Sequence, residues 1–223
     1  MLYALGDPIS LLLLLVSFIV AVTLHGFVQA LVASRTGDGR PAAGGRTTPD
    51  PRRHVDPFGA VGAAISGVGW AKPIEAPNRK SRGALLATLL SGPIANLVLG
   101  LVTLVLFRVA GGPPIAGGST VLLQQGVTGE FALRALLLFG LSNLFVGLLS
   151  LVPLPPLDGG RLLFALAPQT PGWQKAEYQL VDRNIGVAVL LALLLIPLGG
   201  PQALLPTLLS ILGAPLVRLV TGG

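Results

Sequence analysis

A histidine and a glutamine lie four residues apart at the end of the first long apolar run, in the stretch Leu24-His-Gly-Phe-Val-Gln-Ala30. Residues at this spacing share one face of a helix, so His25 and Gln29 are predicted to point the same way. In the zinc pattern H-E-x-x-H, the same spacing supplies two imidazole ligands and a glutamate that acts as general base. Here Gly26 stands at the glutamate position and Gln29 at the second histidine position.

Asp158 is a second residue that could take part in such a site, because it directly follows a proline-rich segment. The prolines at positions 153, 155 and 156 each remove a backbone donor, so they predict an extended segment that ends in a carboxylate. Such a segment could present its edge and its carboxylate to a bound peptide. Two simpler interpretations stay open: the histidine could be an internally hydrogen-bonded residue, and the Asp-Gly pair could be only a turn.

The composition places the chain among membrane proteins. Of its 223 residues, 52% are hydrophobic and only 11% are charged, and the mean hydropathy is +0.79. A soluble domain usually carries about 25% charged residues. The absence of cysteine excludes a disulfide framework and any metal site built from thiolates. No basic stripe interleaved with aromatic residues occurs, so the net charge of +6 does not indicate a nucleic-acid partner. The expected surroundings are the lipid bilayer.

Several apolar segments approach the length of about 20 helical residues that crosses roughly 30 Å of hydrocarbon. The expected fold is therefore an all-α membrane protein with about five transmembrane helices, in a single polytopic domain that comprises residues 1–223. The predicted spans run from Leu5 or Ile9 to about Ala33, from Ala84 to Ala110, from Phe131 to Leu154, from Asn184 to Leu198 and from Gln202 to Val220.

The basic residues predict how these spans are oriented. Cytoplasmic loops carry an excess of Lys and Arg, and nine of the fifteen basic residues lie between the first two spans: Arg35, Arg40, Arg46, Arg52, Arg53, Lys72, Arg79, Lys80 and Arg82. The loop of residues 34–83 is therefore expected in the cytoplasm, with the amino terminus outside. A multi-pass protein of a bacterial cell membrane fits this pattern and the Gly, Pro, Ala and Arg bias.

Within this loop, the stretch from Pro57 to Trp70 is apolar but too short and too rich in glycine for a spanning helix. We expect it to form a re-entrant or interfacial hairpin, because irregular backbone at membrane depth must be covered by protein. In the predicted topology, His25 and Asp158 both lie near the cytoplasmic ends of their spans. Ionisable groups at one depth inside a membrane domain could share a functional site.

Five motifs in one order resemble the site-2 protease family of intramembrane zinc metallopeptidases, and most closely its compact bacterial and archaeal group without a large inserted domain. The histidine stretch stands where the family has H-E-x-x-H. The other family motifs are H-x-D-P-x-G, G-W-A-K-P, G-P-x-A-N and N-x-x-P-x-P-P-L-D-G. They correspond here to His54-Val-Asp-Pro-Phe-Gly59, Gly69-Trp-Ala-Lys-Pro73, Ser91-Gly-Pro-Ile-Ala-Asn96 and Leu151-Val-Pro-Leu-Pro-Pro-Leu-Asp-Gly159. The resemblance extends from about residue 18 to residue 195.

The resemblance implies roles for individual residues. In the family, two imidazoles and the aspartate of the D-G segment hold zinc, while the glutamate activates the zinc-bound water. His25 and Asp158 match two of the ligand positions. Gln29 falls on the third ligand position and Gly26 on that of the base. The positions that match motifs for substrate handling or structure are Asn96, Ser150, Pro153, Pro155 and Gly159, with Ser150 in place of the family's asparagine.

These differences predict that zinc proteolysis is lost and that no catalytic residue is intact. A catalytic zinc generally has three protein ligands and an open position, and a glutamine amide is a weaker ligand than imidazole. Loss of a general base typically costs about 10²–10⁴-fold in rate. One rescue remains open: the loop could fold back so that His54 completes a metal set with His25 and Asp158.

Three functions are therefore considered. The first is a catalytically silent pseudoprotease that binds membrane segments, such as those of single-span proteins, or modulates a partner protease. The second is an active intramembrane zinc metalloendopeptidase with an atypical ligand set. The third is a structural membrane subunit or small transporter. Transporters are often built from inverted repeats with broken helices, and no such repeat is evident here.

Overall fold

The computed structural model describes residues 1–74, 81–115, 119–197 and 203–222. Within these ranges the regular structure is helical, apart from one antiparallel bridge between Val55 and Ala71, which confirms the predicted all-α class. Two of the predicted span ends, at Leu198 and Gln202, lie outside the described residues. So do two basic residues of the first loop, Arg79 and Lys80.

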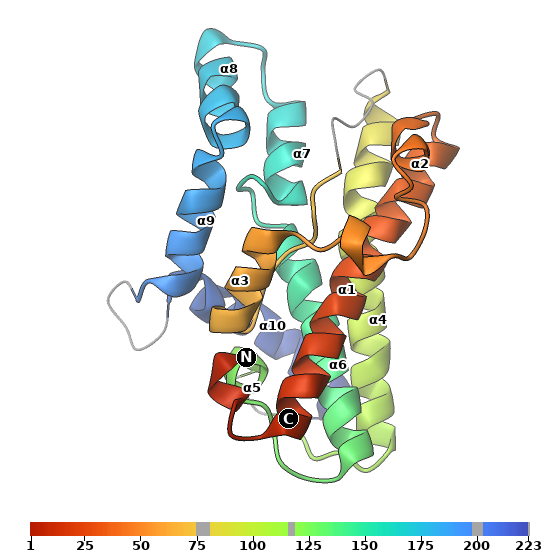
Figure 1. Ribbon diagram of the computed structural model, residues 1–223, viewed down its shortest axis with the longest axis vertical. Coiled ribbons are helices and arrows are strands. Elements are labelled where there is room, and N and C mark those ends of the chain that lie inside the picture. The colour runs from red at the N-terminus through yellow and green to blue at the C-terminus, as the bar shows by residue number, and fades with distance from the viewer. Residues whose placement is uncertain (75–80, 116–118, 198–202, 223) are drawn as a thin grey trace.

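The helices follow one another along the chain and are coloured in that order in Figure 1. Short 3-10 turns are η1 (Leu2–Ala4) and η2 (Pro51–Arg53), and η3 (Tyr178–Asp182) is a π-helical turn. The α-helices are α1 (Pro8–Arg35), α2 (Arg40–Ala43), α3 (Pro57–Ser66), α4 (Arg82–Val109), α5 (Ser119–Gln125), α6 (Phe131–Ser150), α7 (Asp158–Leu166), α8 (Pro171–Glu177), α9 (Ile185–Leu195) and α10 (Leu204–Thr221).

Four of the described helices, α1, α4, α6 and α10, are long and apolar enough to cross a membrane. A fifth span is possible if the helical segment Pro171–Asp182 and α9, which meet at an angle of 68°, count as one broken span. The number of about five predicted spans is confirmed. The third span ends at Ser150 rather than at the predicted Leu154. The reason is that Pro153 has no backbone N–H and cannot continue a helical ladder.

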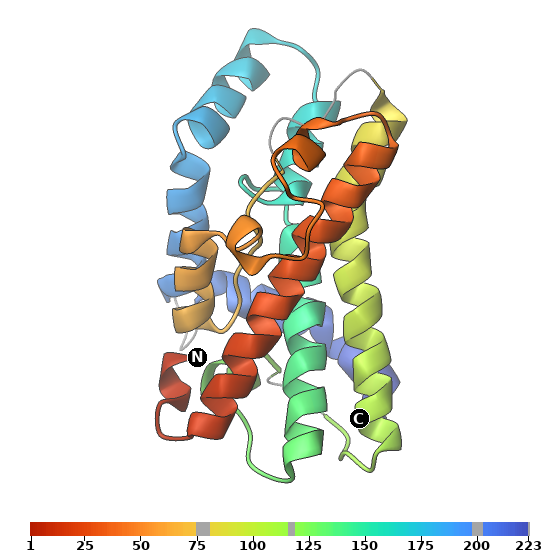
Figure 2. The same cartoon turned by 45° about the vertical axis from the view of Figure 1, so that its right-hand side comes forward.

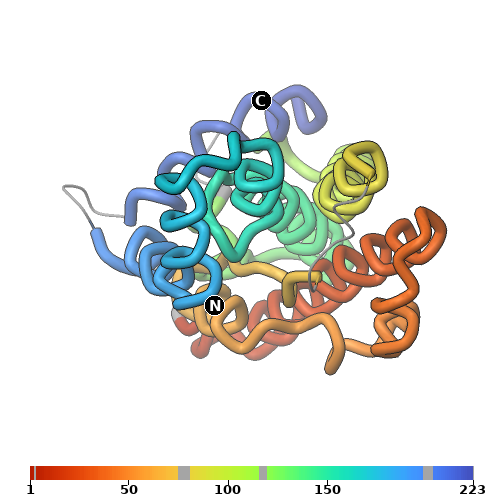
Figure 3. The backbone as a smooth tube through the Cα atoms, turned by 90° about the horizontal axis from the view of Figure 1, so that it is seen from above, coloured from red at the N-terminus to blue at the C-terminus, as the bar shows by residue number. Residues whose placement is uncertain are grey.

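The long helices α1, α4 and α6 pack against one another and form the core. Figures 2 and 3 show that α6 lies between α1 and α10. The helix α10 packs across α4 and α6 on the side away from α1. Glycines let α4 and α6 approach closely. A Cβ at Gly100 would lie 2.6 Å from the amide nitrogen of Leu144, and one at Gly140 would lie 2.9 Å from the Leu104 side chain. Small residues at such crossings are typical of membrane helices.

The stretch from Pro57 to Trp70 folds back on itself, as the hairpin prediction requires. The carboxylate of Asp56 accepts a hydrogen bond from the Gly59 amide at 2.8 Å and caps α3. The helix ends at Gly67, whose φ of +83° is the left-handed conformation that glycine adopts readily. The chain then returns along α3, and a Cβ at Gly59 would lie only 2.2 Å from the carbonyl oxygen of Trp70. The depth of this hairpin in a membrane stays a prediction.

Candidate functional site

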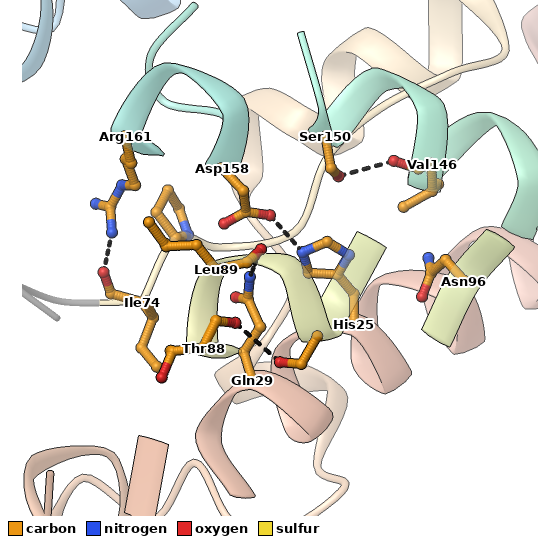
Figure 4. Close-up of polar contacts among 12 residues, drawn as sticks. His25, Gln29, Ile74, Thr88, Leu89, Asn96, Val146, Ser150, Asp158 and Arg161 are labelled. Carbon is orange, nitrogen blue, oxygen red and sulfur yellow. Dashed lines mark hydrogen bonds and ion pairs between the residues drawn. The ribbon is translucent and has the colours of Figure 1, made fainter. Parts of the chain in front are cut away.

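His25 and Asp158 lie against each other in the interior of the molecule. His25 belongs to α1, Asp158 is the first residue of α7, and both are buried. The Nε2 atom of the imidazole lies 2.7 Å from Oδ2 of the carboxylate (Figure 4). The structure thus brings together two residues that the sequence places 133 positions apart.

The proline-rich segment positions Asp158 by turning rather than by extending. After α6 ends, the Leu157 amide donates to the Leu154 carbonyl at 3.0 Å and closes a turn, so the predicted extended edge is wrong. The Asp-Gly pair is not a turn but the start of α7. A Cβ at Gly159 would lie 2.2 Å from the Leu151 carbonyl oxygen, and one at Gly160 would lie 2.2 Å from the Pro155 nitrogen. These glycines let the first turn of α7 rest on the segment that contains Pro153, Pro155 and Pro156.

The neighbouring polar side chains donate to backbone carbonyls instead of completing a metal site. Gln29 is buried, and its amide nitrogen donates to the Leu89 carbonyl of α4 at 3.3 Å. Asn96 links α4 back to α1 through the Ala21 carbonyl at 3.2 Å. Ser150 donates within its own helix, to the Val146 carbonyl at 2.7 Å. Gln29 and Asn96 therefore join helices, whereas Ser150 satisfies its hydroxyl locally.

His54 occupies the space beside Gly26, the position of the family's general base. A Cβ at Gly26 would lie 2.5 Å from Nδ1 of His54 and 3.1 Å from a guanidinium nitrogen of Arg46. The His54 imidazole is fully buried, and its Nε2 lies 2.9 Å from the Thr48 carbonyl oxygen. The loop therefore folds back onto α1, but it brings His54 to the base position. Across the described ranges, no three His, Cys, Asp or Glu side chains are close enough to hold a metal, so His54 completes no set with His25.

The surroundings of His54 favour its neutral form. Burial lowers the pKa of His54 below its ordinary value, because an imidazolium loses its hydration there. The charges of Arg46 and Arg53 lower the pKa further, whereas the hydrogen bond to Thr48 and the carboxylate of Asp50 raise it. The net direction is downward. A neutral imidazole that donates to Thr48 through Nε2 leaves Nδ1 as an acceptor facing Gly26.

A small cavity adjoins the His25–Asp158 pair. Its volume of about 10 Å³ corresponds to roughly one water molecule, and its walls include Trp70, Lys72 and Pro73. Glycine again permits close packing, because a Cβ at Gly92 would lie 2.6 Å from His25 Nε2. Trp70, Lys72, Pro73 and Gly92 are not among the site residues that the sequence predicts. They belong to the G-W-A-K-P and G-P-x-A-N matches, and those motifs are the signal that could identify them.

The donor set does not fit a catalytic zinc ion. Such an ion generally takes three protein ligands of the imidazole, thiolate or carboxylate kind and keeps one position open. Here two such donors, His25 and Asp158, hydrogen-bond to each other. The third family position carries the amide of Gln29, which is directed to a backbone carbonyl. The other ring nitrogen of His25 has no hydrogen-bond partner among the described residues.

Comparison with known proteins identifies the family. Residues 15–194 match the sequence profile of Peptidase family M50. A protein of Bacillus subtilis (strain 168), named "Putative zinc metalloprotease YwhC", is 36% identical over 200 residues, which cover 86% of this chain and 85% of the relative. No solved structure gives a significant match. The match extends over most of the chain and includes both His25 and Asp158. The chain therefore belongs to Peptidase family M50, the site-2 protease family.

Proposed function

We propose that this chain is a catalytically silent member of its family, which binds membrane segments of other proteins without cutting them. The observation that carries the proposal is the occupation of the former catalytic positions. The His54 imidazole lies beside Gly26, and the two remaining ligand-type residues bond to each other. Both losses affect one catalytic unit, so a weak replacement for either one does not restore the reaction.

A second cavity supports the binding role. A cleft of about 440 Å³ lies between α3 and α9, and its walls include the apolar side chains of Phe58, Leu180 and Val187. Pro73 and Pro156 line both this cleft and the small cavity beside His25. A cleft of this size with mainly apolar walls suits an apolar peptide segment. Such a segment would lie next to the former catalytic positions without meeting a zinc-bound water.

Metal content and cleavage test the silent state. The full chain is purified in detergent without added zinc, metal per chain is measured, and cleavage of a single-span membrane protein is followed in the same preparation. We expect metal far below one ion per chain and no cleavage. One zinc per chain, with cleavage that disappears in both His25→Ala and Asp158→Ala, would overturn the proposal and establish the active peptidase instead.

A restored variant tests whether the fold has kept the family geometry. Gly26→Glu and Gln29→His return the missing base and ligand, and His54→Ala removes the imidazole that lies 2.5 Å from the new Cβ. We expect this triple variant to bind zinc. The matched control carries Gly26→Gln with the same two further substitutions, and it keeps the ligands while lacking the base. Zinc binding by both variants with cleavage by the first alone would show that the base is the last missing part.

Crosslinking tests the binding role separately. The chain has no cysteine, so Phe58→Cys gives a unique thiol at the cleft. A single-span protein with one cysteine in its apolar segment is offered to this variant under oxidising conditions. Ile94→Cys is the matched control, because Ile94 is similarly exposed on α4 and outside the cleft. Equal crosslinking at the two positions would reject the cleft as the binding place.

A further inference from the structure

The tip of the hairpin that contains α3 rests on α5. Ser66 is the last residue of α3, so its carbonyl oxygen has no partner within that helix, and the side-chain amide of Gln124 donates to it at 2.9 Å. A Cβ at Gly67 would lie 2.8 Å from the carbonyl carbon of Leu123, which is fully buried. Backbone and side-chain atoms of α5 therefore both support the tip. Figure 1 shows α5 at the end of the molecule opposite α2.

The helices α10 and α1 hold α5 and the loop that follows it. The hydroxyl groups of Thr120 and Ser210 share a hydrogen bond between α5 and α10. The Ser10 hydroxyl of α1 donates to the Val127 carbonyl at 3.1 Å and accepts from the Val127 amide at 3.2 Å. Glycine at position 126 permits this approach, because a Cβ at Gly126 would overlap the Ser10 side chain. The position of α5 is thus tied to two of the long helices.

An ion pair completes this anchor at the start of α1. The Arg134 guanidinium of α6 donates to the Ser10 hydroxyl at 2.7 Å and pairs with the Asp7 carboxylate. Arg134 is buried, and a buried guanidinium that loses its carboxylate keeps an uncompensated charge. Asp7 also caps α1 by accepting from the amides of Ile9 and Ser10 at 3.2 Å each. Loss of the Asp7 carboxylate should therefore loosen Ser10, the residue that holds the loop after α5.

The opposite end of the hairpin forms one wall of the cleft between α3 and α9. Phe58 in the first turn of α3 and Pro73 after the return segment both line this cleft. The helix and the return segment pack backbone against backbone, since a Cβ at Gly69 would overlap the Gly59 carbonyl oxygen. Packing of this density transmits a displacement instead of absorbing it. A shift of the tip on α5 should therefore move the wall of the cleft.

We propose that α5 controls the width of this cleft from a distance, through the hydrogen bond between Gln124 and Ser66. A single neutral hydrogen bond contributes little net stability, so this tie can open and close reversibly. A ligand that contacts α5 differently in the two arrangements would shift their populations. In the predicted orientation, the cleft would then respond to an event outside the cell. The purpose of this control, the admission of an apolar segment, rests on the proposed function, whereas the coupling itself does not.

Thiol reactivity in the cleft tests the coupling. Val187→Cys places a unique thiol on the α9 wall, where Val187 is half-buried. Its rate of modification by a water-soluble maleimide is measured in detergent, in the full chain, with and without Gln124→Leu, which removes the donor and keeps the side-chain size. The matched control is Gln125→Leu, the same change at an exposed neighbour. We expect Gln124→Leu to raise the rate about fivefold, since a lost hydrogen bond of roughly 1 kcal/mol changes the open population by that factor.

A second variant disturbs the anchor without altering α5. Asp7→Asn removes the carboxylate that pairs with Arg134, and its matched control, Glu130→Gln, removes a similar charge from an exposed position. We expect the rate at Val187→Cys to rise in Asp7→Asn and not in Glu130→Gln. Leu162→Cys, which is half-buried on α7 and does not line the cleft, reports any general loosening of the fold. Thermal unfolding of each variant verifies that it is folded.

The rates decide between coupling and general loss of stability. A faster rate at Val187→Cys in both Gln124→Leu and Asp7→Asn, with Leu162→Cys and the two controls unchanged, supports the coupling. An unchanged rate in Gln124→Leu overturns it. Equal rises in the controls or at Leu162→Cys also overturn it, because they indicate a fold that is less stable throughout. These rates require no bound peptide, so the coupling can fail while crosslinking at Phe58→Cys still supports the binding role, and the reverse.

Discussion

At the scale of single residues, the contact between Gly26 and His54 has the largest chemical consequence. The position that supplies the general base in the family carries no side chain here, and an imidazole lies where that side chain would begin. His54, which belongs to the loop between α1 and α4, is buried, and it does not line the small cavity beside His25. It therefore fills the space of a base without access to that cavity.

The first prediction concerns this steric contact. Gly26→Glu alone should destabilise the protein by about 1–3 kcal/mol, because the new Cβ meets His54 Nδ1 at 2.5 Å in a packed interior. Adding His54→Ala should recover part of the loss. Thermal unfolding in detergent measures both effects. Gly83→Glu is the control, since Gly83 is exposed and its nearest neighbour lies at 3.9 Å. A loss for Gly83→Glu as large as that for Gly26→Glu would reject the steric explanation.

The second prediction concerns pH. The pKa of His54 is lowered in the folded protein, so below about pH 6.5 the unfolded chain binds a proton that the native chain does not. The free energy of unfolding should therefore fall as the pH drops through this range. Arg46 and Arg53 strengthen the effect, and Asp50 opposes it.

Comparison of the parent with His54→Gln, from about pH 7.5 down to pH 5.5, measures this contribution. Other titrating groups are common to both proteins, so the difference between the two stability curves reports His54. The parent should lose more stability than the variant on acidification. Parallel curves would show that His54 contributes nothing to the pH dependence.

At the scale of elements, the junction between α6 and α7 determines where the carboxylate lies. Apolar residues continue after Ser150 as far as Leu154, so hydropathy alone predicts the end of the span four residues too late. Proline chemistry identifies a break there but does not give its shape. After the turn at residues 154–157, α7 packs on the proline-rich segment. This packing depends on the close approach of Gly159 and Gly160 to backbone atoms of that segment. Such contacts arise only when the chain is folded.

The third prediction tests this packing of α7 on the proline-rich segment. Gly159→Ala places a Cβ 2.2 Å from the Leu151 carbonyl oxygen, a backbone atom that cannot rotate away. We expect a loss of about 1–3 kcal/mol, measured by thermal unfolding, because overpacking forces α7 away from the proline-rich segment. Gly172→Ala in α8 has open space around it and should be neutral or slightly stabilising. Equal stability changes for the two substitutions would show that the close packing at Gly159 does not stabilise the position of α7.

The sequence predicts the bounds of the long helices better than it predicts which side chains pack against one another. Hydropathy placed the second span at residues 84–110, and α4 spans 82–109. The shared depth of His25 and Asp158 followed from the order and direction of the spans. The partner of His54 could not be obtained in this way, because it depends on how a loop of about fifty residues closes. A motif can assign a residue to a site, whereas only the folded backbone determines which neighbour it meets.

At the scale of the whole molecule, the basic loop and the order of spans predict one orientation. The described helices α1, α4, α6 and α10 are long enough to cross a membrane, and nine of the fifteen basic residues lie from Arg35, the last residue of α1, to Arg82, the first residue of α4. The positive-inside rule then predicts that this loop faces the cytoplasm and that the α5 region lies outside.

The fourth prediction tests that orientation by labelling single cysteines, which the natural chain lacks. Thr128→Cys, exposed after α5, should react with a membrane-impermeant maleimide in intact cells. Gly39→Cys, exposed in the basic loop, should react only after the cells are permeabilised. Leu14→Cys is buried in α1 and should react in neither case. The opposite pattern at positions 39 and 128 would reverse the topology.

The packing of His54 against Gly26 also constrains how the sequence can change over time. A single substitution that introduces glutamate at position 26 would meet the imidazole and lower stability, and with it the amount of folded protein, whatever its effect on catalysis. His54 would first have to be replaced, and Gln29 would still stand at the family's third ligand position. Under the proposed silent state, the contact would therefore oppose a single-step return of the family's base at position 26.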